Sequence, residues 1–195
     1  MKYPLEISTE PATQPLTLQE AKDFMREDRD VEDSLIQQFV GAARKNLENH
    51  TGYVLIDTVF KLYLEDFSDI KLPKKPIKSG SVSIEYVDTT GAKQTLTASK
   101  YNVHEVDSPV QIEFLSNLPD LDNDEKYPVI ITFTAGYGAA ESDIPDDWKS
   151  VIGLMTMILW NRDLPLQGDK VIDFNPLNYG VIRAQLQGYM IGRFK

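Results

Sequence analysis

Apolar and polar positions change period along the chain, and each change marks a different predicted element. Between Val129 and Thr134, apolar Val129, Ile131 and Phe133 alternate with their neighbours, which is the period of a half-buried strand. A later stretch, Trp148–Trp160, is apolar on nearly every side of the helix that it predicts. A helix of this kind must be covered on every side, either by the rest of the fold or by a neighbouring subunit.

Two amphipathic helices are predicted near the start of the chain. Thr17 and Glu20 have the spacing of a capping box, in which the hydroxyl and the carboxylate each satisfy a free backbone N–H group. From Val31 to Asn49, apolar residues recur at three- and four-residue steps, which is typical of a helix with one buried face. Gly52 follows at the position where a helix commonly ends.

The middle of the chain has the shorter period of strands. Its alternating runs are rich in β-branched and aromatic residues, and turn residues separate them. The predicted strands are Val54–Phe67, Val82–Val87, Lys93–Thr97, Tyr101–Val106, Gln111–Leu115 and Val129–Thr134. Two prolines make Ile70–Ile77 an edge or a connector. The spacing predicts an antiparallel meander of five or six short strands rather than β–α–β units.

The predicted fold class is therefore α+β. An N-terminal helical hairpin and C-terminal helices pack together, and an antiparallel β-meander is inserted between them. We expect a single domain made of an extended arm (1–16), a helical part (17–52), a β region (54–134), the apolar helix (145–162) and a basic C-terminal segment (174–195). The proline-rich arm is either a floppy terminus or a segment that lies on a neighbour.

Composition narrows the classes of function. The chain has 195 residues, 42% of them hydrophobic, a formal net charge of -10 and no cysteine. This charge argues against binding duplex DNA through the whole surface, because such binding depends on lysine and arginine. Without cysteine there are no disulfides, thiolate nucleophiles or cysteine zinc sites. No signal peptide or membrane span is recognisable, so we expect a soluble protein made inside the cell.

No catalytic constellation emerges from the sequence, and we predict no enzyme, cofactor or metal. His50 and His104 fall in different predicted elements, and His50 is interpreted as a residue at a helix end. Gly136–Gly138 is too short to bind phosphate and is interpreted as the turn that ends a strand. A small metal-dependent hydrolase stays a less favoured alternative, and a regulatory binding module stays another.

An acidic loop, Leu118–Tyr127, begins like a calcium-binding loop but does not continue as one. Asp120, Asp122 and Asp124 have the right spacing, yet Glu125 replaces the required glycine, and the closing glutamate is absent. We therefore interpret the loop as a solvated acidic surface.

Two features suggest contacts between copies of the chain. Acidic residues predominate in 1–33, whereas the segment from Phe174 onward has basic residues and no acidic ones, a difference that suits head-to-tail contacts. The apolar helix is either a core helix or a helix with one face in a subunit interface. The candidate interface residues are Trp148, Ile152, Met155, Leu159 and Trp160.

An ordered set of phrases gives a family resemblance. The phrases are LTLQEAKDFMR at Leu16–Arg26, DRDVEDSLI at Asp28–Ile36, RKNLENHTGYVL at Arg44–Leu55, LPKKPI at Leu72–Ile77, SVSIEYVDTTG at Ser81–Gly91, VIITFTAGYG at Val129–Gly138, DIPDDWKSVI at Asp143–Ile152 and WNRD at Trp160–Asp163. Together they resemble the head–tail connector (adaptor) proteins of tailed double-stranded-DNA phages and prophages. The resemblance covers about residues 16–163.

This resemblance implies a structural virion protein of the particle neck, assembled in the host cytoplasm. Such a protein forms a ring of about twelve or thirteen copies beneath the portal and extends the DNA channel, which DNA crosses without specific binding. Its partners would be other copies, the portal and a tail-completion protein, and no membrane. The resemblance assigns portal docking to the C-terminal segment, with Arg183, Tyr189, Arg193 and Phe194 as candidates. Asp120, Asp122 and Asp124 would line the channel. Another neck or tail-completion protein is the alternative within virion structure.

Overall fold

The computed structural model describes residues 3–26, 33–161 and 180–190 of the chain. Backbone contacts divide the chain into two compact units, each built from two separate stretches of sequence. The sheet unit comprises Met1–Pro11 and Asp57–Gly136, and the helical unit comprises Ala12–Ile56 and Tyr137–Lys195. Helices and antiparallel strands thus form an α+β fold, as the change of period along the sequence predicted.

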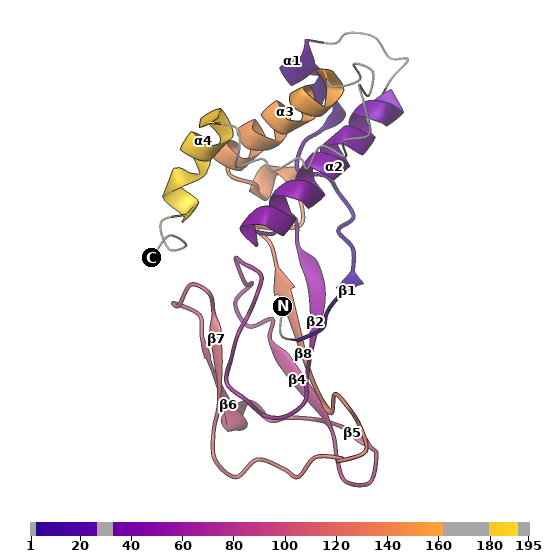
Figure 1. Ribbon diagram of the computed structural model, residues 1–195, viewed down its shortest axis with the longest axis vertical. Helices are drawn as coiled ribbons and strands as arrows, with labels where there is room; N and C mark the ends of the chain where they lie inside the picture. Colours follow the sequence, from indigo (N-terminus) through magenta and orange to yellow (C-terminus); the bar gives the residue numbers. More distant parts are fainter. Residues whose placement is uncertain (1–2, 27–32, 162–179, 191–195) are drawn as a thin grey trace, which may run out of the picture. The chain divides into compact units, whose positions relative to one another are not determined.

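The helical unit contains four α-helices within its described residues (Figure 1). Their bounds are Leu18–Met25 for α1, Asp33–Thr51 for α2, Asp146–Asn161 for α3 and Gly180–Met190 for α4. A short 3₁₀ helix, η2 (Glu141–Asp143), precedes α3. The two N-terminal helices, the helix at Trp148–Trp160 and the last helix were all predicted, with ends that differ by a few residues.

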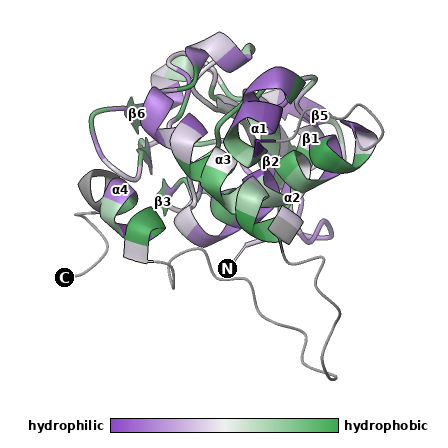
Figure 2. Cartoon of the chain, turned by 90° about the horizontal axis from the view of Figure 1, so that it is seen from above, coloured by the Kyte–Doolittle hydropathy of each residue, from purple (hydrophilic) through white to green (hydrophobic). Residues whose placement is uncertain are grey.

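The core of the helical unit lies among these helices. Fifteen buried apolar side chains form one cluster, from Leu16, Ala21, Ile36, Val40, Ala43, Leu47, Leu55, Ile56, Ile144, Trp148, Val151, Ile152, Met155, Ile182 and Leu186. Figure 2 shows hydrophobic residues concentrated where α2 and α3 lie side by side. Gly153 lets α3 approach α1 closely, since a Cβ there would lie 2.4 Å from the ring of Phe24.

The sheet unit contains two antiparallel sheets (Figure 1). The strands are β1 (Leu5–Thr9), β2 (Thr58–Leu64), β3 (Ile70–Lys71), β4 (Ser83–Val87), β5 (Lys93–Thr95), β6 (Tyr101–His104), β7 (Gln111–Phe114) and β8 (Val129–Ala135). The larger sheet has the order β1-β2-β8-β4-β5, and the smaller has the order β3-β7-β6. A 3₁₀ turn, η1 (Ala98–Lys100), leads into β6.

Strands β2 and β8 form the centre of the larger sheet. Both alternate strictly between buried and half-buried residues, and the rings of Phe60 and Phe133 stack across the pair with centroids 5.5 Å apart. The strand order differs from the simple meander that was expected, because β8 lies between β2 and β4 rather than at the end of the row. A central strand is stabilised by cross-strand contacts on both sides. The spacing of strands along the sequence does not indicate which strand takes the central position.

The N-terminal segment contributes a strand to the larger sheet. β1 pairs antiparallel with β2, with Leu5 opposite Leu62 and Ile7 opposite Phe60, and the register shifts between Ile7 and Thr9. The segment is extended, as predicted, but its pairing with a strand more than fifty residues away was not predicted.

Gly136 ends β8 for a steric reason. Its φ of +149° is one that residues with a side chain rarely adopt, and a Cβ there would lie 2.5 Å from the backbone nitrogen of Asp57. The backbone N–H of Gly136 donates to the carbonyl of Pro76 at 2.9 Å. The prediction that this glycine-rich stretch ends a strand is confirmed.

Candidate interaction surfaces

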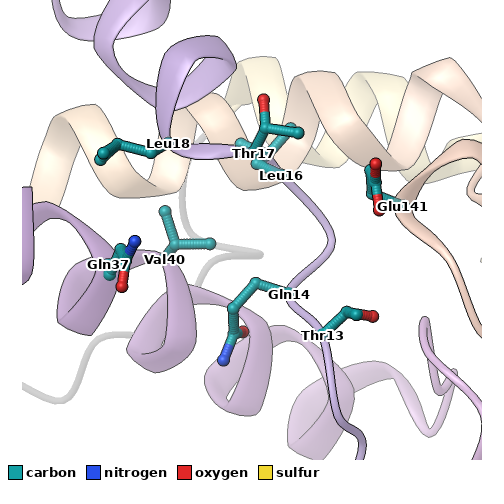
Figure 3. Close-up of a pocket in the computed structure, with 8 residues that line it drawn as sticks. All are labelled: Thr13, Gln14, Leu16, Thr17, Leu18, Gln37, Val40 and Glu141. Atoms are coloured by element: carbon teal, nitrogen blue, oxygen red, sulfur yellow. The ribbon is translucent and has the colours of Figure 1, made fainter.

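A pocket of about 290 Å³ lies on the helical unit (Figure 3). Five of its eight lining side chains are polar and three are aliphatic, and they come from the segment before α1, the first residue of α1, α2 and η2. The lining residues are Thr13, Gln14, Leu16, Thr17, Leu18, Gln37, Val40 and Glu141. The lining combines amide, hydroxyl and aliphatic groups with the carboxylate of Glu141. The hydroxyls of Thr13 and Thr17 donate to the Ala139 carbonyl and to the Glu20 carboxylate, so neither forms a nucleophile–base pair with Glu141.

The start of α1 is fixed by a network around Glu20. The backbone N–H of Thr17 donates to the Glu20 carboxylate at 2.7 Å, and the backbone N–H of Glu20 donates to the Thr17 hydroxyl at 3.2 Å. Lys149 of α3 donates to the same carboxylate at 2.8 Å. Burial would raise the pKa of Glu20, but the hydrogen bonds from Lys149 and Thr17 outweigh it and lower the pKa below its ordinary value. The predicted capping box is present and also ties α1 to α3.

The five candidate interface residues of α3 differ in exposure. Trp148, Ile152 and Met155 are fully buried in the unit's own core. Trp148 donates its indole N–H to the Tyr137 hydroxyl at 2.8 Å. Leu159 and Trp160 are only partly buried, at the end of the helix. A subunit contact through this helix would therefore fall on Leu159 and Trp160, while the other three residues support the fold.

The acidic loop lies beside the β4–β5 hairpin. Asp120 and Asp124 are exposed and Asp122 is half-buried. The Asp122 backbone N–H donates to the carbonyl of Val87 in β4 at 3.0 Å, and its carboxylate accepts the backbone N–H of Asp124 at 2.9 Å. The loop is thus anchored at Asp122, and its other two candidate carboxylates face solvent.

The candidate portal-docking residues are only partly described by the structure. Arg183 is an exposed residue of α4. Tyr189 belongs to the last turn of α4, and its side chain lies outside the described residues, as do Arg193 and Phe194.

The described residues contain no cluster of three or more histidine or carboxylate groups that could hold a metal ion. The two histidines belong to different units: His104 contacts Glu113 of the neighbouring strand at 3.1 Å, and His50 contacts the carbonyl of Asn46 in α2 at 2.9 Å. No helix in the described part of the chain is long and apolar enough to cross a membrane.

The two edges of the larger sheet are surfaces that the sequence reasoning missed. Among the residues that the structure describes, β1 and β5 each have a neighbouring strand on one side only, and four of the five residues of β1 and all three of β5 are exposed. The signal for β1 was the alternation of Leu5 and Ile7 with Glu6 and Ser8, which was obscured by the surrounding prolines.

Comparison with known proteins finds solved structures with a similar fold. No protein-family model matches the chain, and no curated protein matches it. Solved structures do match. One is a chain in the neck of an empty gene transfer agent (GTA) particle computed with C6 symmetry, with a TM-score of 0.73, 23% identity and coverage of 93% of this chain and 94% of that chain.

Two further structures agree. A chain in the virion of a native GTA particle has a TM-score of 0.71 and 22% identity, and one in the neck of a native GTA particle computed with C12 symmetry has a TM-score of 0.69 and 24% identity. In both, 93% of this chain and 94% of the other are covered. The chain thus has the fold of a protein found in these particles, over nearly its whole length.

Proposed function

We propose that the protein is a structural component of the neck of a phage or phage-like particle. In this role it forms a ring beneath the portal, connects the head to the tail and extends the channel through which DNA passes. The observation that carries the proposal is the fold shared, over 93% of the chain, with a chain of GTA necks solved with C6 and C12 symmetry. The ordered sequence phrases that resemble head–tail connectors support it independently.

The surfaces of the chain suit this role. The role is non-enzymatic, and we expect neither a cofactor nor a metal in it. Leu159 and Trp160, half-buried at the end of α3, are the candidates for a contact between subunits through the helical unit. Arg183, with the residues that follow it, is the candidate for docking to the portal. A cyclic ring needs two different patches that meet between neighbours, rather than one patch that meets itself.

Asp120, Asp122 and Asp124 are the candidates for the channel wall. Carboxylates repel the phosphate backbone, so a wall of this kind would let DNA slide without binding it. DNA would then be a passing substrate of the channel and not a ligand of any single subunit.

The mass of the purified full-length chain, measured by light scattering over a wide concentration range, tests the proposal. We expect a species of about twelve subunits, formed by the chain alone or after the portal protein of the same particle is added. A chain that stays monomeric with and without the portal would contradict the connector role. Binding to the tail tube in place of the portal would instead favour another neck or tail-completion protein.

A further inference from the structure

The larger sheet ends in two strands that each have an open edge in the described part of the chain. β1 and β5 are the first and last strands in the order β1-β2-β8-β4-β5. An open edge offers a row of N–H and C=O groups that another strand can pair with. The register shift of β1 falls after Ile7, so Leu5–Ile7 is regular, and Lys93–Thr95 contains no proline. Both edges can therefore accept a strand.

The hydrogen-bond pattern shows which residues of β1 face outward. The backbone N–H of Tyr63 in β2 donates to the carbonyl of Pro4 at 3.1 Å, so Pro4 points toward β2. Along an antiparallel strand, the backbone N–H and C=O groups of successive residues point alternately to the strand on one side and to the strand on the other. Glu6, opposite Lys61, therefore also points toward β2, and the N–H and C=O groups of Leu5 and Ile7 point away from the sheet.

The same reasoning applies to β5. The N–H of Leu96 donates to the carbonyl of Ile84 in β4 at 2.8 Å, and the N–H of Asp88 donates to the carbonyl of Ala92 at 3.0 Å. Ala92, Gln94 and Leu96 thus point toward β4. The backbone groups of Lys93 and Thr95 point outward.

We propose that β5 of one copy pairs with β1 of the next copy, so that the sheet continues from subunit to subunit around the ring. This inference rests on the proposed function, because it supplies a contact for the ring. All neighbours in the larger sheet are antiparallel, so the first and the last of its five strands, β1 and β5, run in the same direction. A repeated rotation brings them together as a parallel pair.

The faces of the two strands agree with parallel pairing. In a parallel pair, a residue whose backbone N–H and C=O groups point toward the partner strand lies beside a residue whose backbone groups point away. The side chains of these two residues lie on the same face of the sheet. Leu5 lies on the face of Leu62, and Gln94 lies on the face of Tyr86, which pairs with buried Val129. These two faces are the same face of one sheet, because the pairs continue from β2 through β8 to β4.

The pairing that overlaps most places Leu5 beside Gln94, Glu6 beside Thr95 and Ile7 beside Leu96. Ile7 is 47% exposed and is one of three exposed large apolar residues in the part of the chain that the structure describes, whereas Leu96 is 4% exposed. Pairing would cover Ile7 with a neighbouring apolar residue. On the other face, Glu6 would approach Lys93, giving opposite charges across the contact.

Charge also argues against a two-fold contact of β1 with itself. An antiparallel β1–β1 pair with Leu5 opposite Ile7 would place the two copies of Glu6 directly opposite each other, and like charges in that position are destabilising. A two-fold contact also closes after two copies and cannot build a ring. The second copy's β5 is therefore the favoured occupant of the β1 edge.

Disulfide trapping in the full-length chain tests the pairing. The chain has no cysteine, so every cross-link must come from the introduced residues, and the single variants identify links between identical positions. Neighbouring strands are about 4.8 Å apart, which suits the usual Cα separation of a disulfide. We expect the double variant Glu6→Cys/Thr95→Cys to give a ladder of multimers after oxidation that a reductant collapses. Each single variant should stay monomeric on the same denaturing gel.

A proline variant provides an independent test. Thr95→Pro removes an outward N–H, which takes no part in pairing within the chain, so the circular dichroism spectrum should be unchanged. The oligomer seen by light scattering should be lost. Thr95→Ala keeps the N–H and is the matched control, and it should assemble like the unmodified chain.

The outcomes separate this inference from the proposed function. An oligomer that forms without the disulfide ladder, and that tolerates Thr95→Pro, would overturn the strand pairing but leave the ring. Cross-linking by Glu6→Cys alone would show a two-fold β1 contact and would overturn the inference in that way. Absence of any oligomer, with and without the portal, would overturn the proposed function and the inference together.

Discussion

The helical unit and the sheet unit satisfy their backbones in different ways. In α2 and α3, backbone groups bond within each helix, and the side chains of one face, such as Trp148 and Ile152, are sealed in a shared core. In the larger sheet, each strand bonds to its neighbours, and within the described stretches of the chain β1 and β5 have one neighbour instead of two. In the described residues, the backbone groups of the helices thus bond mostly within each helix, whereas the two edge strands of the larger sheet have backbone groups that a further strand could pair with.

The same contrast separates residues that hold the fold from residues that can make an assembly. An apolar side chain on α3 was predicted to serve either purpose. Three of the five candidates lie in the core of a single chain, whereas Ile7, on a sheet edge, remains 47% exposed. We therefore expect a contact between copies at Ile7, where a large exposed apolar residue lies beside open backbone groups.

Among the substitutions considered, Trp148→Ala is expected to destabilise the helical unit most. The side chain is fully buried, its ring centroid lies 4.9 Å from that of Tyr53, and its N–H donates to Tyr137. Removing it leaves a large cavity, so the free energy of unfolding should fall by about 3–5 kcal/mol in a urea titration. Trp160→Ala is the matched control, and its half-buried ring should cost about 1–2 kcal/mol. Equal losses would show that the core does not centre on Trp148.

In the sheet unit, we expect a substitution at Gly136 to cause a large loss of stability. Gly136→Ala would drive a Cβ against the backbone of Asp57, and we expect a loss of about 3 kcal/mol. Gly80→Ala is the control, because Gly80 has a φ of +67° but nothing within 4 Å of an added Cβ, and it should cost about 1 kcal/mol. Thermal unfolding followed by circular dichroism measures both. If the two variants melt together, the close approach at Gly136 contributes nothing.

Removing the capping box at the start of α1 should have a smaller effect on stability. Thr17→Ala should lower the free energy of unfolding by about 1 kcal/mol, whereas Thr97→Ala, at the start of η1 where no capping hydrogen bond forms, should leave it nearly unchanged. A similar loss from both variants would contradict the role of the cap.

The pH dependence follows from Glu20. Its pKa in the folded chain lies below the ordinary 4.5, so its contribution is present above that value and is lost as the pH falls through the folded pKa. Unfolding midpoints measured from about pH 6 down to about pH 3 should therefore decline less steeply in Glu20→Gln than in the unmodified chain. Equal slopes would contradict the contribution of the Glu20 carboxylate.

The smallest effect on stability is expected in the acidic loop. Replacing Asp120, Asp122 and Asp124 together by Asn should change the free energy of unfolding by less than about 0.5 kcal/mol, since two of the carboxylates are exposed. The amide oxygen introduced at position 122 can still accept the bond from the backbone N–H of residue 124. Assembly should be intact, but DNA packaging or ejection should slow or stall. Unchanged DNA passage in particles carrying the variant would show that the loop does not line the channel.

Local patterns predicted the elements of this protein well. The capping box at Thr17 and Glu20, the apolar stripe of α2 and the alternation in β8 each depend on residues close together in the sequence. Spacing of this kind decides the type of an element, because a helix or a strand buries one face at a fixed period. It also predicted that Gly136 ends a strand.

The sequence by itself therefore determined where the helices and most strands lie, and that the chain has an α+β fold. Only the tertiary structure decided that β8 lies between β2 and β4, that Leu5–Thr9 is an edge strand, and that Trp148, Ile152 and Met155 belong to the core. The physical reason is that strand partners and buried contacts join residues far apart in the chain. Which strands pair and which side chains are buried together depends on how well distant surfaces fit. The local spacing of apolar residues does not indicate that fit.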